Sequence, residues 1–264
     1  MATPRSYPAG GTLPALFIGH GSPMNALEDN AYTRGWRDVA QAMPQPKAIL
    51  CVSAHWETRG VAVCDSAQPE TIHDFYGFPQ ALFDVRYPAP GDPALARRVA
   101  EAVSGVPVQR TSQWGLDHGA WSVLRIMYPQ ADIPVVQLSL DTAQPGDFHL
   151  RVARQLAPLR DEGVLILGSG NIVHNLRLWN FRDPAPIAWA IRANDLLRER
   201  IVAGDSAALA DWHELGADVA LAVPTPEHYL PLLYALGARR DGEQIHIFND
   251  AVTSSLAMTC VRVG

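Results

Sequence analysis

The sequence has little cysteine and no long hydrophobic run, and each absence excludes a class of protein. Its three cysteines, Cys51, Cys64 and Cys260, are scattered without CxxC spacing. A disulfide framework is therefore not expected, and a reducing cytoplasm is the expected location. No segment reaches the roughly 18 apolar residues that a membrane span requires. The opening residues, MATPRSYPAGG, lack the apolar core of a secretory signal peptide.

Basic residues and local metal motifs are also scarce. The chain has 21 Lys and Arg against 27 Asp and Glu, which gives a formal net charge of -6. Without a basic patch, a nucleic-acid partner is not expected. Without an apolar span, a membrane partner is not expected either. The sequence contains no HExxH motif and no paired CxxC motifs, so no local zinc signature is present. Its hydrophobic content of 48% is that of an ordinary globular protein.

The chain does contain a regular alternation of short apolar runs and helical segments. Near-continuous apolar strands between helices indicate a sheet that is covered on both faces. We therefore expect a single α/β domain over residues 1–264, with a central mixed, largely parallel sheet flanked by helices and a metal site at the strand ends. Residues 69–90 are predicted as a long irregular loop or a small hairpin, and loops of this length often form functional lids. Strands are predicted at residues 15–18, 48–53, 61–64, 106–109, 133–138, 164–167, 244–248 and 256–261. Helices are predicted at residues 93–103, 120–127, 147–159, 187–202 and 227–236, with one or two short helices over residues 207–222.

Four histidines stand where the chain is predicted to leave a strand or enter a helix. His20 follows LPALFIG, His55 follows AILCVSA, and His174 follows VLILGSGNIV. His228 opens the helix predicted at residues 227–236. Ligands of open α/β sheets gather at the carboxyl ends of the strands. We therefore expect these four histidines to surround one metal ion, which iron, zinc, copper or nickel would suit.

The predicted helix gives His228 a further property. Thr225 is expected as its N-cap and Pro226 as its first helical residue. The helix dipole disfavours a cation at this end, so we expect a lowered pKa for His228. A neutral imidazole is the form that binds a metal.

The remaining histidines are interpreted individually. His118, in WGLDHGAW, would suit hydrogen bonding to a phenolic substrate, or would simply cap a packed loop. His73, in the loop over residues 69–90, is expected in a structural or substrate-contacting role, while His149, His213 and His246 are expected to be structural. An aromatic pocket could be lined by Trp56, Phe75, Tyr76, Trp114, Trp179 and Tyr229.

Five ordered motifs together resemble one family. GHGSPMNAL, SAHWET, GLDHGAW, GSGNIVHNL and PTPEHYLPLLYALGA contain His20, His55, His118, His174 and His228 in turn. They resemble the class III extradiol ring-opening dioxygenases, in the branch that includes the 4,5-DOPA dioxygenases. The resemblance implies that His20, His55 and His228 hold one metal. It also implies that His174 is an acid/base residue that can complete a four-histidine shell around zinc, and that His118 acts on the substrate side.

The resemblance further implies a catecholic substrate, dioxygen, and one divalent metal per chain, with Fe(II) required for activity and Zn(II) a plausible bound ion. Better-studied extradiol enzymes use two histidines and one carboxylate, whereas this chain has His228 at the third position. The adjacent Glu227 is therefore a lesser ligand candidate. Two alternatives stay open: a zinc-dependent hydrolase, and a non-catalytic metal-binding or ligand-binding protein on the same scaffold.

Overall fold

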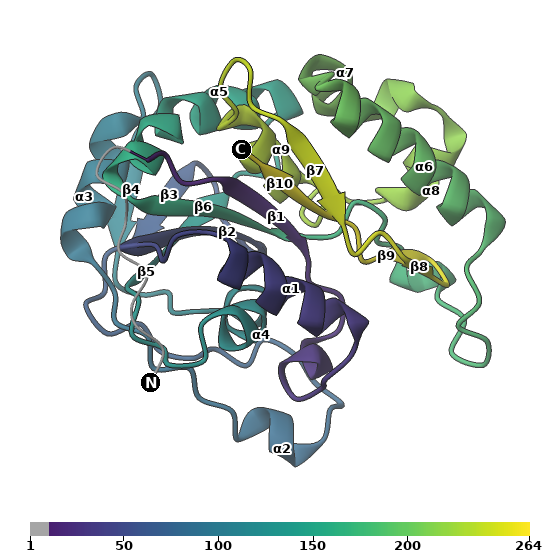
Figure 1. Ribbon diagram of the computed structural model, residues 1–264, viewed down its shortest axis with the longest axis horizontal. Helices are drawn as coiled ribbons and strands as arrows, with labels where there is room; N and C mark the ends of the chain where they lie inside the picture. Colours follow the sequence, from purple (N-terminus) through teal and green to yellow (C-terminus); the bar gives the residue numbers. More distant parts are fainter. Residues whose placement is uncertain (1–10) are drawn as a thin grey trace.

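The computed structural model describes residues 11–264, and eight strands of this part form one mixed sheet (Figure 1). The strand order is β4-β3-β5-β2-β6-β1-β10-β7. The central strands β5, β2, β6 and β1 run parallel, whereas β10 at one side pairs antiparallel with both of its neighbours, β1 and β7. The strands are β1 (Ala15–Gly19), β2 (Ala48–Glu57), β3 (Val61–Cys64), β4 (Val108–Thr111), β5 (Val135–Leu140), β6 (Val164–Gly170), β7 (Ile245–Phe248) and β10 (Cys260–Val263).

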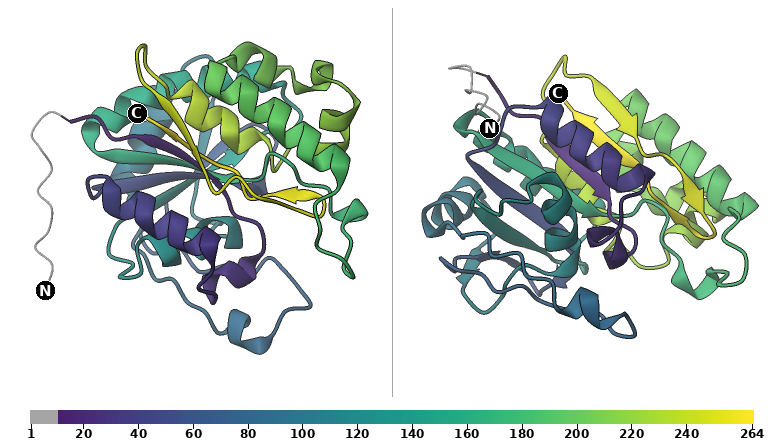
Figure 2. Two further views of the ribbon diagram at one scale, coloured as in Figure 1. Left: turned by 45° about the vertical axis from the view of Figure 1, so that its right-hand side comes forward. Right: turned by 60° about the horizontal axis from the view of Figure 1, so that its bottom comes forward.

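Helices cover both faces of the sheet (Figures 1 and 2). Strand β1 shows the reason in its sequence, because Leu16 and Ile18 belong to one buried cluster and Ala15 and Phe17 to the other. Successive side chains of a strand point to opposite faces, so both faces need a hydrophobic cover. One face packs on α1 (Ala31–Ala42) and α4 (His118–Met127), and the other on α3 (Pro93–Ala102), α5 (Gly146–Leu156), α6 (Ala188–Ala203) and α9 (Leu230–Gly237).

The predicted α/β domain with a mixed, largely parallel sheet is confirmed, with local corrections. Strand β2 continues to Glu57 rather than ending at residue 53, so His55 lies inside the strand. The region over residues 69–90 is irregular as predicted and contains only the short helix α2 (Gln80–Phe83). The segment 207–222 contains two helices, α7 (Ser206–Ala210) and α8 (Ala217–Ala222). The last predicted strand, 256–261, is divided into β9 (Leu256–Ala257) and β10. Strand β9 pairs with β8 (Val252–Thr253).

The helix predicted at residues 227–236 starts later than expected. Helix α9 begins at Leu230, and residues 227–229 form a turn in which Tyr229 and Leu230 both donate their amides to the carbonyl of Pro226. Thr225 is not the N-cap, because its hydroxyl donates to Glu227 Oε1 instead of accepting from a helix amide. His228 therefore lies in the turn before α9, outside its first helical turn.

Within residues 11–264, no helix is both long enough and apolar enough to cross a membrane. The first ten residues, on which the prediction about a signal peptide depends, lie outside the described part of the chain.

Candidate metal centre

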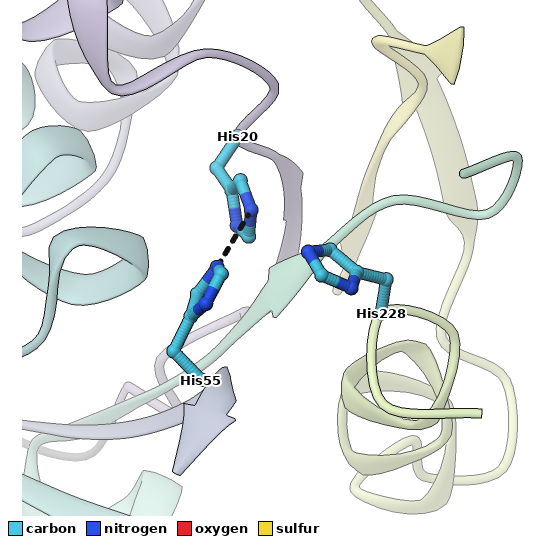
Figure 3. Close-up of side chains that lie close together, drawn as sticks. All are labelled: His20, His55 and His228. Atoms are coloured by element: carbon cyan, nitrogen blue, oxygen red, sulfur yellow. Dashed lines mark hydrogen bonds between the residues drawn. The ribbon is translucent and has the colours of Figure 1, made fainter. Parts of the chain in front are cut away.

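Three of the predicted histidines converge at the carboxyl edge of the parallel strands (Figure 3). His20 directly follows β1 and His55 lies near the end of β2. Both strands neighbour β6, so the two side chains reach the same edge of the sheet. The turn before α9 brings His228 to them, and one ring nitrogen of each histidine lies within 4.8 Å of the others.

The spacing of these rings fits three ligands of one ion. The ring centroids of His20, His55 and His228 are 5.0 to 5.4 Å apart in all three pairs. Imidazoles that bind one ion at a metal–nitrogen distance near 2.1 Å would have centroids about 4.6 to 5.3 Å apart. The Nε2 atoms of His20 and His55 are 3.3 Å apart, close to the roughly 3.4 Å expected for two nitrogens of a tetrahedral site.

Each of these three rings has an oxygen beside its Nδ1 atom. Ser169 Oγ donates its proton to the carbonyl of Gly119, so it accepts from His20 Nδ1 at 2.9 Å. His228 Nδ1 donates to Glu227 Oε1 at 3.1 Å.

For His55, the oxygen is a carboxylate oxygen of Asp74, which lies 3.5 Å from Nδ1. Oxygen partners at Nδ1 favour the tautomer whose Nε2 atom keeps its lone pair. The donor set therefore fits a metal that prefers nitrogen ligands.

Glycines let the elements approach closely enough to form this cluster. A Cβ on Gly170, the last residue of β6, would collide with the carbonyl oxygen of His228. That carbonyl accepts from the amide of Asn171 at 2.8 Å, which fixes the turn before α9 on the end of β6. A Cβ on Gly119, in the first turn of α4, would press on Ser53 Oγ and on the ring of His55.

Burial keeps these imidazoles neutral. Burial, followed by the neighbouring imidazoles, lowers the pKa of His20 and of His228 well below its usual range. Burial lowers the pKa of His55 to about 3, with His118 as the next cause. The lowered pKa of His228 is as predicted, but its cause is burial among other rings, because the residue lies outside the helix whose dipole was expected to act.

His174 occupies a different position from the other three. Its ring stacks flat on His228, with centroids 3.5 Å apart and an angle of 9° between the planes. Parallel rings at this spacing do not both contain a single ion in their planes, although His174, Glu227 and His228 form a second group whose ligand atoms lie within 4.8 Å of one another. Burial lowers the pKa of His174 to about 4, so the ring is a neutral base beside the site.

His118 is the first residue of α4, which begins two residues before the predicted start at residue 120, and Asp117 caps that helix by accepting from the amide of Ala120. The ring of His118 lies against His55, with centroids 3.9 Å apart. The sequence analysis missed Asp74, which contacts both of these histidines. Burial alone would raise the pKa of Asp74, but hydrogen bonds and charge from His118 outweigh it and lower the pKa. No local pattern marks Asp74, because its hydrogen-bond partner His118 lies 44 positions along the chain and its other contact, His55, lies on a different element.

Only some of the aromatic residues that were expected to line a pocket lie near the histidines. Among the expected aromatic residues, Phe75 meets the ring of His118 edge-on at 5.5 Å, while Tyr229 is fully buried and Tyr76 is 91% exposed. Trp56 and Trp114 stack on each other in a separate small cluster.

His73 and His149 have structural partners. The ring of His73 donates to the carbonyl of Val85. His149 is buried between the hydroxyl of Tyr234 and the carbonyl of Asp141.

Comparisons with known proteins agree with this arrangement. A family model described as the catalytic LigB subunit of aromatic ring-opening dioxygenase matches residues 14–259. A protein of Escherichia coli K12 named 4,5-DOPA dioxygenase extradiol is 49% identical over 96% of this chain and 95% of its own length. A protein of the same name from Beta vulgaris is 37% identical over 89% of this chain and 90% of its own length. The crystal structure of an uncharacterized protein from Escherichia coli K12 superposes with a TM-score of 0.84 at 43% identity, covering 96% of this chain and 100% of that one.

Proposed function

This chain belongs to the LigB family of aromatic ring-opening dioxygenases, and on that premise we propose that His20, His55 and His228 hold the metal of an extradiol dioxygenase that opens a catecholic ring with dioxygen. The observation that carries the ligand assignment is the convergence of these three rings, each with an oxygen beside Nδ1. The family assignment favours this reaction over the hydrolase and the non-catalytic alternatives.

The identity of the metal follows from the reaction. When bound, Fe(II) supplies a redox-active centre with open positions for both catechol oxygens and dioxygen. Zinc binds nitrogen ligands more tightly than Fe(II). Purified protein is therefore expected to contain zinc unless iron is supplied.

Two histidines beside the ligands are assigned to the substrate. A catechol must lose protons as it binds and must receive one later, and a neutral imidazole can serve in both steps. We assign this role to His174, because its ring lies on His228 without sharing the geometry of the three ligands. His118 is assigned to orienting or protonating a substrate oxygen, since its ring lies directly against His55.

The histidines of the site are shielded from bulk water, which suits the proposed reaction. His20 is 2% exposed, His118 7% and His228 8%. A catecholate bound to the metal would offset the charge of a site whose ligands are all neutral, and this attraction is stronger in a low-dielectric pocket.

The substrate class is proposed from the relatives. Those from Escherichia coli and Beta vulgaris are named 4,5-DOPA dioxygenase extradiol. We therefore propose 3,4-dihydroxyphenylalanine or a similar catechol, opened between carbons 4 and 5 to give a yellow product. The three cysteines are buried and unpaired, which is consistent with the proposed location in the reducing cytoplasm.

The test is reconstitution without oxygen. Metal-free protein is loaded with Fe(II) under anaerobic conditions, mixed with each member of a panel of catechols, and then exposed to oxygen. We expect oxygen uptake and a yellow product with at least one catechol. The zinc-loaded protein and the Fe(II)-treated His55→Ala variant are the matched controls and should consume no oxygen. Absence of uptake with the whole panel would contradict the proposed function.

A further inference from the structure

The carboxylate of Asp74 lies between a proposed metal ligand and the proposed substrate-side histidine. Its Oδ2 atom is 3.5 Å from Nδ1 of His55 and 3.0 Å from Nδ1 of His118. These are charge contacts that are not aligned as hydrogen bonds, and among the described residues the buried Nδ1 atom of His118 has no hydrogen-bond partner. Its Oδ1 atom accepts from the backbone amide of His118 at 2.9 Å. The side chain is 20% exposed, so water only partly screens these contacts. A single carboxylate is therefore in contact with both histidines.

The segment that carries Asp74 is fixed on the start of α4. The amide of Ile72 donates to the carbonyl of Leu116 at 2.7 Å. The indole of Trp121 donates to the carbonyl of Ile72 at 2.8 Å. These bonds hold the chain two residues before Asp74, so its carboxylate reaches the two imidazoles from a defined position within the irregular loop.

We propose that Asp74 is a positioning residue that keeps the Nδ1 atoms of both His55 and His118 protonated. Nε2 of His55 is then free for the metal, and Nε2 of His118 is the nitrogen left for the substrate. This inference depends on the metal site proposed above. The negative charge of a carboxylate beside the second nitrogen of a ligating histidine favours the proton on that nitrogen and leaves the other nitrogen for the metal.

Asp74 also supplies a negative charge next to three proposed ligands that are themselves uncharged. Three neutral imidazoles leave the charge of a divalent ion uncompensated. Glu227 stands beside Nδ1 of His228 as Asp74 stands beside Nδ1 of His55. The pair places two negative charges just outside the three ligands, which favours binding of a divalent cation.

Replacing the carboxylate of Asp74 by an amide distinguishes a residue that positions the two histidines from one that only anchors the loop. Asp74→Asn preserves the shape of the side chain and can still accept from the amide of His118. Its NH2 group then faces the two Nδ1 atoms, and it favours the opposite tautomer, in which Nε2 carries the proton. A residue that only tethers the loop would tolerate this change, whereas the proposed role would not.

The experiment compares Co(II) binding to metal-free full-length proteins, by chelator competition and by the visible spectrum of the bound ion. We expect Asp74→Asn to bind Co(II) about 10- to 100-fold more weakly than the unaltered protein. At saturating Fe(II), its kcat with a catechol that the unaltered enzyme cleaves should also fall, because His118 is no longer held in one tautomer. Asp84→Asn is the matched control, since it removes one charge from an exposed residue of the same loop.

The outcomes distinguish this inference from the proposed function. Unaltered Co(II) affinity and spectrum in Asp74→Asn, with binding lost in His55→Ala, would overturn the role of Asp74 and leave the metal site standing. Unaltered binding in His55→Ala would overturn the metal site, and the role of Asp74 with it. Thermal unfolding of each metal-free variant verifies that the loss of binding is not a loss of fold.

Discussion

At the level of single residues, the neighbours of each imidazole distinguish the roles that we propose for them. His20 and His228 each donate Nδ1 to an oxygen, which leaves Nε2 for a metal. His174 has no such arrangement and lies flat on His228. Residue type alone could not separate these roles, so the sequence analysis placed His174 both among the ligands and among the acid/base residues.

Alanine variants test this division of roles. His20→Ala removes a ligand, so we expect metal content to fall to a small fraction of one ion per chain. His174→Ala should retain about one ion per chain and lose roughly 100-fold or more in kcat, in the range usual for general acid/base residues. Elemental analysis and oxygen uptake on the same samples give both numbers. Loss of the metal from His174→Ala would make this residue a ligand.

The buried His149 predicts a dependence of stability on pH. Burial lowers its pKa from 6.5 to about 4. Between pH 6.5 and 4, His149 is protonated in the unfolded chain but not in the folded chain. The free energy of unfolding therefore decreases as the pH falls from 6.5 toward 4. This residue should contribute about 2 kcal/mol to the loss between about pH 7.5 and about pH 5. Urea unfolding of the metal-free His149→Gln variant should show a correspondingly smaller loss, and an equal loss would contradict the assignment.

At the level of elements, the ends of three adjacent parallel strands and one turn build the site. Strands β2, β6 and β1 are neighbours in the sheet, and the turn before α9 rests on the end of β6. The apolar run before His20 predicted the end of β1 to within one residue, whereas β6 continues to Gly170, beyond the predicted end at residue 167. The end of β2 was misplaced, because polar and aromatic residues replace the apolar run after Ser53 while the backbone continues as a strand.

Two features of the site could not be read from local sequence. The turn that delays the start of α9 to Leu230 rests on the end of β6, where the carbonyl of His228 accepts from the amide of Asn171. Asp74 depends on contacts with residues of another element, so the aromatic loop was predicted only as irregular. Both arise from tertiary contacts that propensity and capping patterns do not contain.

Gly170→Ala tests whether the turn before α9 must lie close to β6. The new Cβ would collide with the carbonyl of His228 and push this residue away from His20 and His55. Overpacking of this kind costs about 1 to 3 kcal/mol. We expect weaker Zn(II) binding in a variant that still unfolds cooperatively. Zn(II) affinity equal to that of the unaltered protein would show that the position of the turn does not control the site.

At the level of the whole molecule, the sheet brings together residues that are far apart in the chain. His20 and His228 are separated by most of the sequence, yet their ring centroids lie 5.4 Å apart. Helices on both faces bury the strands, so their carboxyl edge is a fixed platform for the site. The family match over residues 14–259 indicates that nearly the whole chain takes part in this architecture.

The most direct test of the central claim is a crystal structure of the metal-loaded protein, with the ion located by its anomalous scattering. We predict one ion per chain at about 2.0 to 2.2 Å from Nε2 of each of His20, His55 and His228, with His174 outside bonding distance. An ion bound elsewhere, or one that does not contact these three nitrogens, would contradict the account.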